Sequence, residues 1–240
     1  MDYKYNGIIL SKIDIAEVDR IYNIYTLEAG KIRVIGKGTR NPNAKLAGSI
    51  EPVTSAEIYV SRTKGLGKIT GAIVLDNFSR LKSDYEYLNK VFYVFGILEK
   101  IITNEEKDEK VFALLLTYLK ILEELAEKGK EKEKIEIVTL GFIFKLLEAA
   151  GYGLNMENCV RCGTRLRPEN NFFSAPSGGV VCSGCADFSA KKVRIESATI
   201  KLIRIFLGNK LENFAKISAS RADIKNTEAI AGEMVRWIVG

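Results

Sequence analysis

The sequence predicts an α+β multidomain protein, with a small β-barrel followed by an α-helical domain that carries an inserted four-cysteine zinc ribbon. Three observations predict this fold. Short β-branched and aromatic runs fill residues 1–80, apolar residues recur at helical spacing from residue 81, and four cysteines interrupt that helical pattern. We therefore expect a barrel domain at 1–80 and a helical domain at 81–240, with the ribbon at 155–187.

Five short runs in the first 80 residues have the composition of β-strands. Turn-forming residues separate them, as in Glu28–Gly30, Asn41–Asn43 and Lys64–Gly67. About five short strands in a segment of this length are typical of a small closed or half-closed barrel rather than a sandwich. The predicted strands are Gly7–Ser11, Ile21–Tyr25, Lys31–Ile35, Ser55–Val60 and Gly71–Leu75.

From Ser83 the apolar residues follow a helical period. Ser83–Glu86 has the pattern of a capping box, in which Ser83 caps the first turn and Glu86 reaches back to it. A nearly continuous apolar stretch at Ile137–Leu147 predicts a helix at the centre of the bundle. Further helices are expected at Asp108–Lys128, Ile135–Ala150, Ser197–Leu207 and Thr227–Val239.

The four cysteines form two Cys-x-x-Cys pairs, Cys159 with Cys162 and Cys182 with Cys185, and 19 residues separate the pairs. This spacing predicts a structural Zn²⁺ ion held by four thiolates, because two sulfurs on one tight turn reach the same ion. Two disulfides or four unrelated free thiols are the alternatives. A site filled by four protein ligands has no open position for water or substrate, so we expect it to stabilise the fold and to perform no catalysis.

Composition excludes several classes of function. The chain contains no histidine, which rules out Ser or Cys nucleophiles served by an imidazole base and zinc sites with histidine ligands. Catalysis by Lys or Glu side chains has no recognisable motif here.

The sequence also lacks membrane and secretion signals. No stretch approaches the roughly 18–20 apolar residues of a membrane span. The N-terminus also lacks the pattern of a signal peptide, and we expect a cytoplasmic protein.

Basic residues concentrate at both ends of the chain. Residues 1–80 carry 12 Lys and Arg against 8 Asp and Glu, and residues 151–240 carry 13 against 8, whereas the middle has an acidic excess. This distribution favours a polyanionic partner.

The stretch from Lys31 to Lys45 has five basic residues and no acidic one. On a barrel, such a strand and its loop can follow a phosphate backbone. The alternative is a strand face that is merely solvated. The aromatic side chains that could stack on nucleic-acid bases are Tyr3, Tyr5, Tyr22, Tyr25 and Tyr59, of which several are expected in the core.

A series of short motifs, in order along nearly the whole chain, resembles the RecO family of bacterial recombination-mediator proteins. The motifs near the start carry the basic stretch, and those near the end enclose the cysteine pairs. They are Gly7–Leu10, Glu17-x-Asp19-Arg20, Gly30–Arg33, Lys37-Gly38-x-Arg40, Leu46–Gly48, Glu51–Pro52, Gly65–Gly67, Leu81–Asp84, Gly151–Gly153, Phe173–Ser174 and Gly178–Gly179.

The resemblance implies an N-terminal OB-fold, a helical domain and a zinc ribbon. It also implies a non-enzymatic protein, nucleoid-associated, that binds single- and double-stranded DNA and anneals complementary strands. With RecR, such a protein helps to load RecA onto DNA coated by single-strand-binding protein, whose acidic, phenylalanine-ended tail the helical domain captures. Some family members lack the cysteines, which agrees with a structural role for zinc. The DNA-contact candidates that the resemblance selects are Lys31, Arg33, Lys37, Arg40 and Lys45.

One rival class of function remains at this point, an accessory factor of transcription or translation that uses a barrel and a zinc ribbon to hold RNA or protein. Strand annealing with DNA compared with RNA discriminates between the two.

Overall fold

The computed structural model divides the chain into two compact units, residues 1–129 and 130–240. No helix among the described residues is both long enough and apolar enough to cross a membrane. The structure describes residues 1–15, 17–41, 43–44, 46–63, 65–102, 106–129, 132–186 and 193–240.

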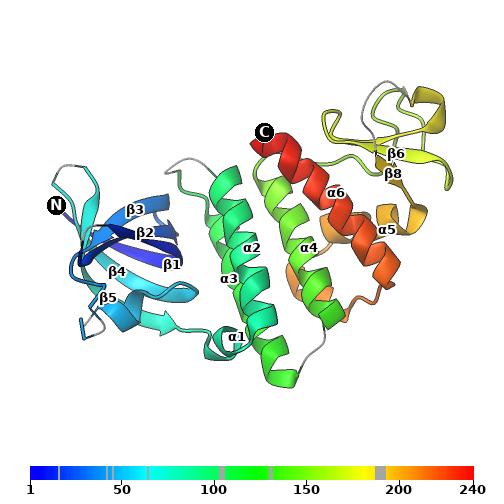
Figure 1. The fold of residues 1–240 in the computed structure, drawn as a ribbon. Helices are drawn as coiled ribbons and strands as arrows, with labels where there is room; N and C mark the ends of the chain where they lie inside the picture. Colours follow the sequence, from blue (N-terminus) through cyan, green and yellow to red (C-terminus); the bar gives the residue numbers. More distant parts are fainter. Residues whose placement is uncertain are drawn as a thin grey trace. The chain divides into compact units, whose positions relative to one another are not determined.

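The first unit begins with a closed five-stranded barrel in the order β1-β2-β3-β5-β4, drawn from blue to cyan in Figure 1. All neighbouring strands are antiparallel except β3 and β5, which run parallel. This is the arrangement of an OB-fold, and the predicted fold class is confirmed. The elements are β1 (Asp2–Ile15), β2 (Asp19–Thr26), β3 (Gly30–Gly36), the short 3₁₀ helix η1 (Ala47–Ile50), β4 (Thr54–Ser61) and β5 (Gly67–Asp76).

Side chains alternate between the two faces of the barrel wall, as the pattern of β3 predicts. Ile32 and Val34 point into the barrel and are almost completely buried. Arg33 is exposed on the outer face, and Lys31 and Ile35 are half-buried there. The inward-facing residues form one core, with members Ile9, Tyr22, Ile24, Ile32, Val34, Ile50, Ala56, Ile58, Val60 and Ile69.

Three helices follow the barrel within the first unit: α1 (Ser79–Ser83), α2 (Tyr85–Ile101) and α3 (Glu109–Lys128). The predicted capping role of Ser83 is wrong. Ser83 is the last residue of α1, and its hydroxyl donates to the Arg80 carbonyl. Asp84 caps α2 instead, because its extended backbone lets its carboxylate accept the N–H of Glu86 at 2.9 Å.

The second unit is organised around α4 (Lys132–Ala149), which contacts three other helical elements. Side chains on all sides of α4 are buried, which confirms the central helix that the apolar stretch predicts. The last helix begins six residues before the predicted Thr227, since Ser220 caps it by accepting the N–H of Asp223. The elements around α4 are α5 (Ser197–Gly208), the 3₁₀ helix η3 (Leu211–Lys216) and α6 (Arg221–Val239).

The cysteine segment lies between α4 and α5 in the chain and contains a three-stranded sheet in the order β7-β6-β8. The antiparallel pairing of Phe173 with Val180 belongs to the hairpin that the residues between the two cysteine pairs predict. The elements are β6 (Asn171–Ser174), β7 (Gly179–Val181), the 3₁₀ turn η2 (Ser183–Cys185) and β8 (Val193–Ile195).

We predict that Gly141→Ala destabilises the second unit. The backbone of α4 passes so close to η3 that a Cβ at Gly141 would lie 2.1 Å from Cδ2 of Phe214. The Phe214 ring is buried and packs 5.0 Å from the Phe206 ring, so it has little room to move. We expect the free energy of unfolding, measured by urea titration, to fall by about 1–3 kcal/mol.

Gly232→Ala in α6 is the matched control, because a Cβ there meets no atom within 4 Å. Its helix propensity alone should raise the free energy of unfolding, by up to about 1 kcal/mol. Equal effects of the two substitutions would contradict the close approach of α4 and η3.

Candidate metal centre and nucleic-acid interface

The structure brings the four cysteine sulfurs together into one cluster. All four Sγ atoms lie within 4.8 Å of one another, and Cys162 Sγ is 3.9 Å from Cys182 Sγ. A tetrahedral Zn²⁺ with Zn–S bonds of about 2.3 Å separates its sulfurs by about 3.8 Å. All four cysteines are free thiols, which removes the disulfide alternative. The cluster therefore fits a metal ion with four sulfur ligands.

Two tight turns present the sulfurs. In the first turn the Gly163 N–H donates to the Cys159 carbonyl at 2.9 Å, and Gly163 adopts a positive φ of 73°, which favours glycine. In the second turn the Cys185 N–H donates to the Cys182 carbonyl at 3.1 Å. The Cys182 N–H also points at Cys159 Sγ, 3.4 Å away, so the two turns are tied to each other.

The surroundings of the cluster favour thiolate at its buried end. Burial raises the pKa of Cys159, but the backbone N–H groups of Cys162, Cys182 and Arg161 outweigh it and lower this pKa to about 6. The neighbouring sulfurs of Cys162 and Cys182 raise the pKa of Cys185 to about 12, because the thiols share protons when they lie so close. A divalent cation would replace these shared protons and stabilise all four thiolates.

The basic residues predicted to contact DNA fall into two groups on the barrel. Arg33 stands on the outer face of β3 and is exposed. Lys31 lies two residues earlier on the same face, where its ammonium donates to the Glu99 carbonyl of α2 at 2.7 Å and burial lowers its pKa. Lys31 therefore stabilises the carboxyl end of α2. Lys45 lies outside the described residues.

Lys37 and Arg40 belong to a loop that two carboxylates hold in place. Lys37 Nζ contacts Asp19 at 2.7 Å, and the Gly38 N–H donates to the same carboxylate at 2.8 Å. These contacts, the Lys37 hydrogen bond first, keep the pKa of Asp19 below its ordinary value. Arg40 Nε lies 3.4 Å from Asp14, which also binds Arg20 at 2.7 Å.

A backbone hydrogen bond and the hydroxyl of a buried threonine also hold this loop in place. The Arg40 N–H donates to the Val18 carbonyl at 3.1 Å. Thr39 is buried and donates its hydroxyl to the Gly36 carbonyl at 3.0 Å. The loop thus presents Lys37 and Arg40 from a fixed backbone at the end of the barrel where β3 ends and β2 begins.

The fold adds one cation that the basic stretch does not contain. Lys68 is the second residue of β5 and lies in parallel register with Ile35 of β3. It is exposed and close enough to Asp19 to contribute to the low pKa of that carboxyl. Lys68 lies 23 residues beyond Lys45, the end of the basic stretch, and only closure of the barrel brings it to this face.

The predicted stacking tyrosines are mostly unavailable. Tyr22 and Tyr25 are completely buried, and Tyr5 packs against the barrel core. Tyr3 and Tyr59 are about one-third exposed, but they lie on β1 and β4, and Tyr59 donates its hydroxyl to Glu57 at 3.0 Å. We call the side of the barrel with Arg33, Lys37, Arg40 and Lys68 the basic face. It has no exposed tyrosine from this set.

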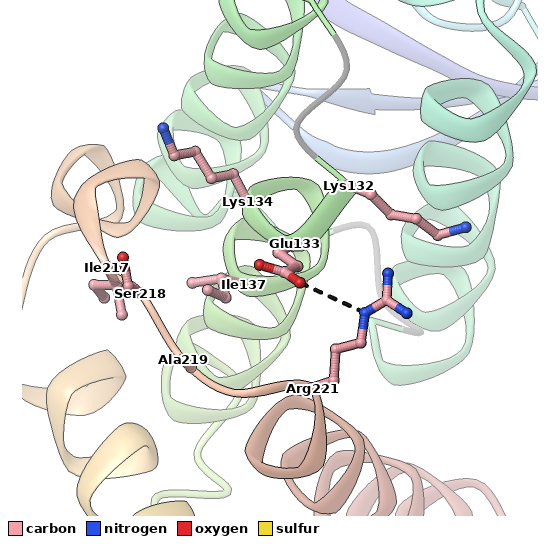
Figure 2. Close-up of a pocket in the computed structure, with 8 residues that line it drawn as sticks. All are labelled: Lys132, Glu133, Lys134, Ile137, Ile217, Ser218, Ala219 and Arg221. Atoms are coloured by element: carbon pink, nitrogen blue, oxygen red, sulfur yellow. Dashed lines mark ion pairs between the residues drawn. The ribbon is translucent and has the colours of Figure 1, made fainter.

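The second unit contains a pocket of about 400 Å³ between the start of α4 and the chain that leads into α6, which Figure 2 shows. We call it the α4–α6 pocket. Ile137 forms part of its apolar wall, and Arg221 Nε lies 3.5 Å from Glu133 Oε1. The lining residues are Lys132, Glu133, Lys134, Ile137, Ile217, Ser218, Ala219 and Arg221.

Comparison with known proteins places the chain in a family. A family model described as "Recombination protein O N terminal" matches residues 1–78, and one described as "Recombination protein O C terminal" matches residues 82–240. A Roseiflexus protein named "DNA repair protein RecO" is 28% identical over 237 residues, which are 99% of this chain and 81% of the relative.

Two further relatives carry the same name. The Dehalococcoides mccartyi strain 195 protein is 26% identical over 99% of this chain and 91% of its own length. The Caldicellulosiruptor bescii protein is 29% identical over 91% of this chain and 86% of its own length. Because the two family models together match nearly every residue, this chain belongs to the RecO family of DNA repair proteins.

Proposed function

We propose that this chain is a recombination mediator of DNA repair that acts in the cytoplasm on the nucleoid. Its barrel domain, residues 1–80, binds single- and double-stranded DNA. The chain anneals complementary strands and, with RecR, promotes loading of RecA onto DNA coated by single-strand-binding protein. The observation that carries the proposal is the fixed basic loop of Lys37 and Arg40 beside Arg33 and Lys68 on one face of an OB-fold, in a chain of the RecO family.

Annealing of this kind needs no bond-making group. Cations that neutralise phosphates reduce the repulsion between two strands, and a surface that holds both raises their local concentration. Lys37 and Arg40 are suited to this role because Asp19 and Asp14 fix them without burying them. The chain would therefore act as a scaffold for strands and not as an enzyme.

We predict that Lys37→Gln combined with Arg40→Gln weakens DNA binding without unfolding the barrel. Loss of two phosphate contacts should reduce the slope of log affinity against log salt by about 1.4 for single strands. Fluorescence anisotropy over a range of salt concentrations measures this slope. Lys110→Gln with Lys120→Gln, on the exposed surface of α3, removes the same charge and should leave the slope unchanged. A slope equal to that of the unaltered chain would reject the loop as the DNA contact.

The rival function, an RNA-associated accessory factor, predicts a different result in the same assay. An accessory factor would anneal or bind RNA as well as DNA and would not associate with RecR. The proposal requires faster annealing of complementary DNA strands than of RNA strands and a stoichiometric complex with RecR on size-exclusion chromatography. RNA-selective annealing together with no RecR complex would favour the rival.

We propose Zn²⁺ as the metal of the four-cysteine cluster, with a structural role only. Sulfur-only ligands select soft or borderline metals, and a closed site leaves no position for a substrate. Cys159, Cys162, Cys182 and Cys185 would hold the ion and so join the two turns of the ribbon.

We predict that removal of zinc destabilises the second unit and leaves the DNA contacts of the barrel in place. Chelation should release one Zn²⁺ per chain, measured with a colorimetric zinc indicator, and should lower the melting temperature of the second unit. Affinity for single-stranded DNA should change by less than about twofold, because the phosphate contacts lie in the other compact unit. A Cys162→Ser chain that stays folded yet loses DNA binding would contradict this division of roles.

We further propose that the α4–α6 pocket captures the acidic, phenylalanine-ended tail of single-strand-binding protein. The pocket supports this because it combines an apolar wall with three basic residues and one acidic residue. Ile137 and Ile217 suit an aromatic ring, and Lys132, Lys134 and Arg221 suit the carboxylates of such a tail (Figure 2).

We predict that Arg221→Ala weakens binding of an acidic peptide ending in phenylalanine by about tenfold, the value of one charge-assisted contact. Isothermal titration calorimetry of the full chain measures this loss. Arg236→Ala is the control, because Arg236 is also an exposed α6 arginine paired with a glutamate. Equal losses from the two variants would exclude the pocket as the peptide site.

A further inference from the structure

Three isoleucines form a continuous row across the outer face of the barrel. Ile13 of β1 lies in register with Ile21 of β2, and Ile21 lies in register with Ile35 of β3. All three point outward, since they alternate with inward residues such as Tyr22 and Val34 of the barrel core. We call Ile13, Ile21 and Ile35 the isoleucine row. It spans two strand spacings, about 10 Å.

The isoleucine row is more exposed to solvent than Ile8 and Tyr25, which lie farther along the same outer face. Farther along the same strands, the outward residues Ile8 and Tyr25 are completely buried, and Lys31 in register with Tyr25 binds α2. Ile13 by contrast is 48% exposed, and Ile21 and Ile35 are half-buried. A solvated face of an antiparallel sheet normally carries polar residues, so a partly exposed apolar row of this kind points to a ligand.

Basic residues lie next to the isoleucine row, so we expect a negatively charged ligand. Lys68 continues the row onto a fourth strand, in register with Ile35. Arg33 occupies the next outward position on β3 and is exposed. The two carboxylates at the edge of the row, Asp14 and Asp19, are each paired with basic side chains. The row therefore lies in a basic setting that suits an anion with apolar parts.

Another exposed apolar patch on the barrel is bordered by acidic residues, one of which, Glu57, pairs with Lys4 at 2.7 Å. Ile73 and Leu75 of β5 are 54% and 57% exposed. Ile73 lies in register with Glu57, and Leu75 is followed by Asp76. Apolar exposure alone thus does not distinguish the isoleucine row, whereas its combination with the exposed cations Arg33 and Lys68 does.

Building on the proposed function, we infer that the isoleucine row seats the unstacked bases of single-stranded DNA while Arg33 and Lys68 hold the phosphates. Bases of a single strand expose apolar faces that can lie on aliphatic side chains, whereas bases of a duplex stack on one another and present only their edges. The row thereby favours single strands over duplex at the same basic face. It takes the place of the aromatic platform that the buried Tyr22 and Tyr25 do not provide.

The test compares two ligands and three chains. The ligands are a thymidine oligonucleotide and an abasic strand of the same length, which keeps the phosphates and lacks the bases. The chains are the unaltered one, Ile13→Thr/Ile35→Thr, and the control Ile73→Thr/Leu75→Thr. Threonine keeps the β-branched shape that suits a strand. We expect the unaltered and control chains to bind the thymidine strand about tenfold more tightly than the abasic strand.

For Ile13→Thr/Ile35→Thr we expect this preference to disappear while the salt slope and duplex affinity stay unchanged. A preference that persists in this variant, or that the control loses equally, overturns the inference. If the double variant does not fold, Ile13→Thr alone decides, because Ile13 is half-exposed and its loss should still reduce the preference. A chain whose binding responds to Lys37→Gln/Arg40→Gln but not to the isoleucine variants keeps the proposed function and rejects the row.

Discussion

The parallel pairing of β3 with β5 is the constraint on which the basic face of the barrel depends. Val34 pairs with Gly67 and Ile35 with Lys68, and these contacts close the barrel. Gly67 is required there, since a Cβ would lie 2.5 Å from Cγ1 of Val60. Closure fixes which side chains of β3 point inward. It also brings Lys68 next to Ile35 on the outer face of the barrel. One strand pairing therefore forms both the buried core and the basic face of the barrel.

Acidic residues organise the basic face instead of opposing it. Asp19 binds both the ammonium of Lys37 and a backbone N–H of the loop, and Asp14 joins Arg20 and Arg40. Exposed ion pairs contribute little to stability, so their main effect is on geometry. They hold a short loop in one conformation, and a pre-organised loop loses less entropy when it meets a phosphate backbone.

The two compact units are stabilised in different ways. The barrel has its own buried core, and the second unit packs η3, α5 and α6 around α4. The ribbon's strands have only three or four residues each, too short to stabilise a sheet by burial alone. A metal ion held by the four clustered sulfurs, as proposed, would supply the cross-link that such short strands lack.

The sequence by itself determined the α+β order, the five strands, the central helix and the clustering of the four cysteines, because each depends on local period or spacing. It misplaced the cap of α2 by one residue, since the intervening short helix α1 is set by contacts that no local pattern contains. Which basic residues are exposed was decided only by the tertiary structure. Lys31 and Arg33 look equivalent along the chain, yet α2 binds the first and leaves the second in solvent. The isoleucine row likewise exists only in three dimensions, because strand register joins residues that are 8 and 14 positions apart.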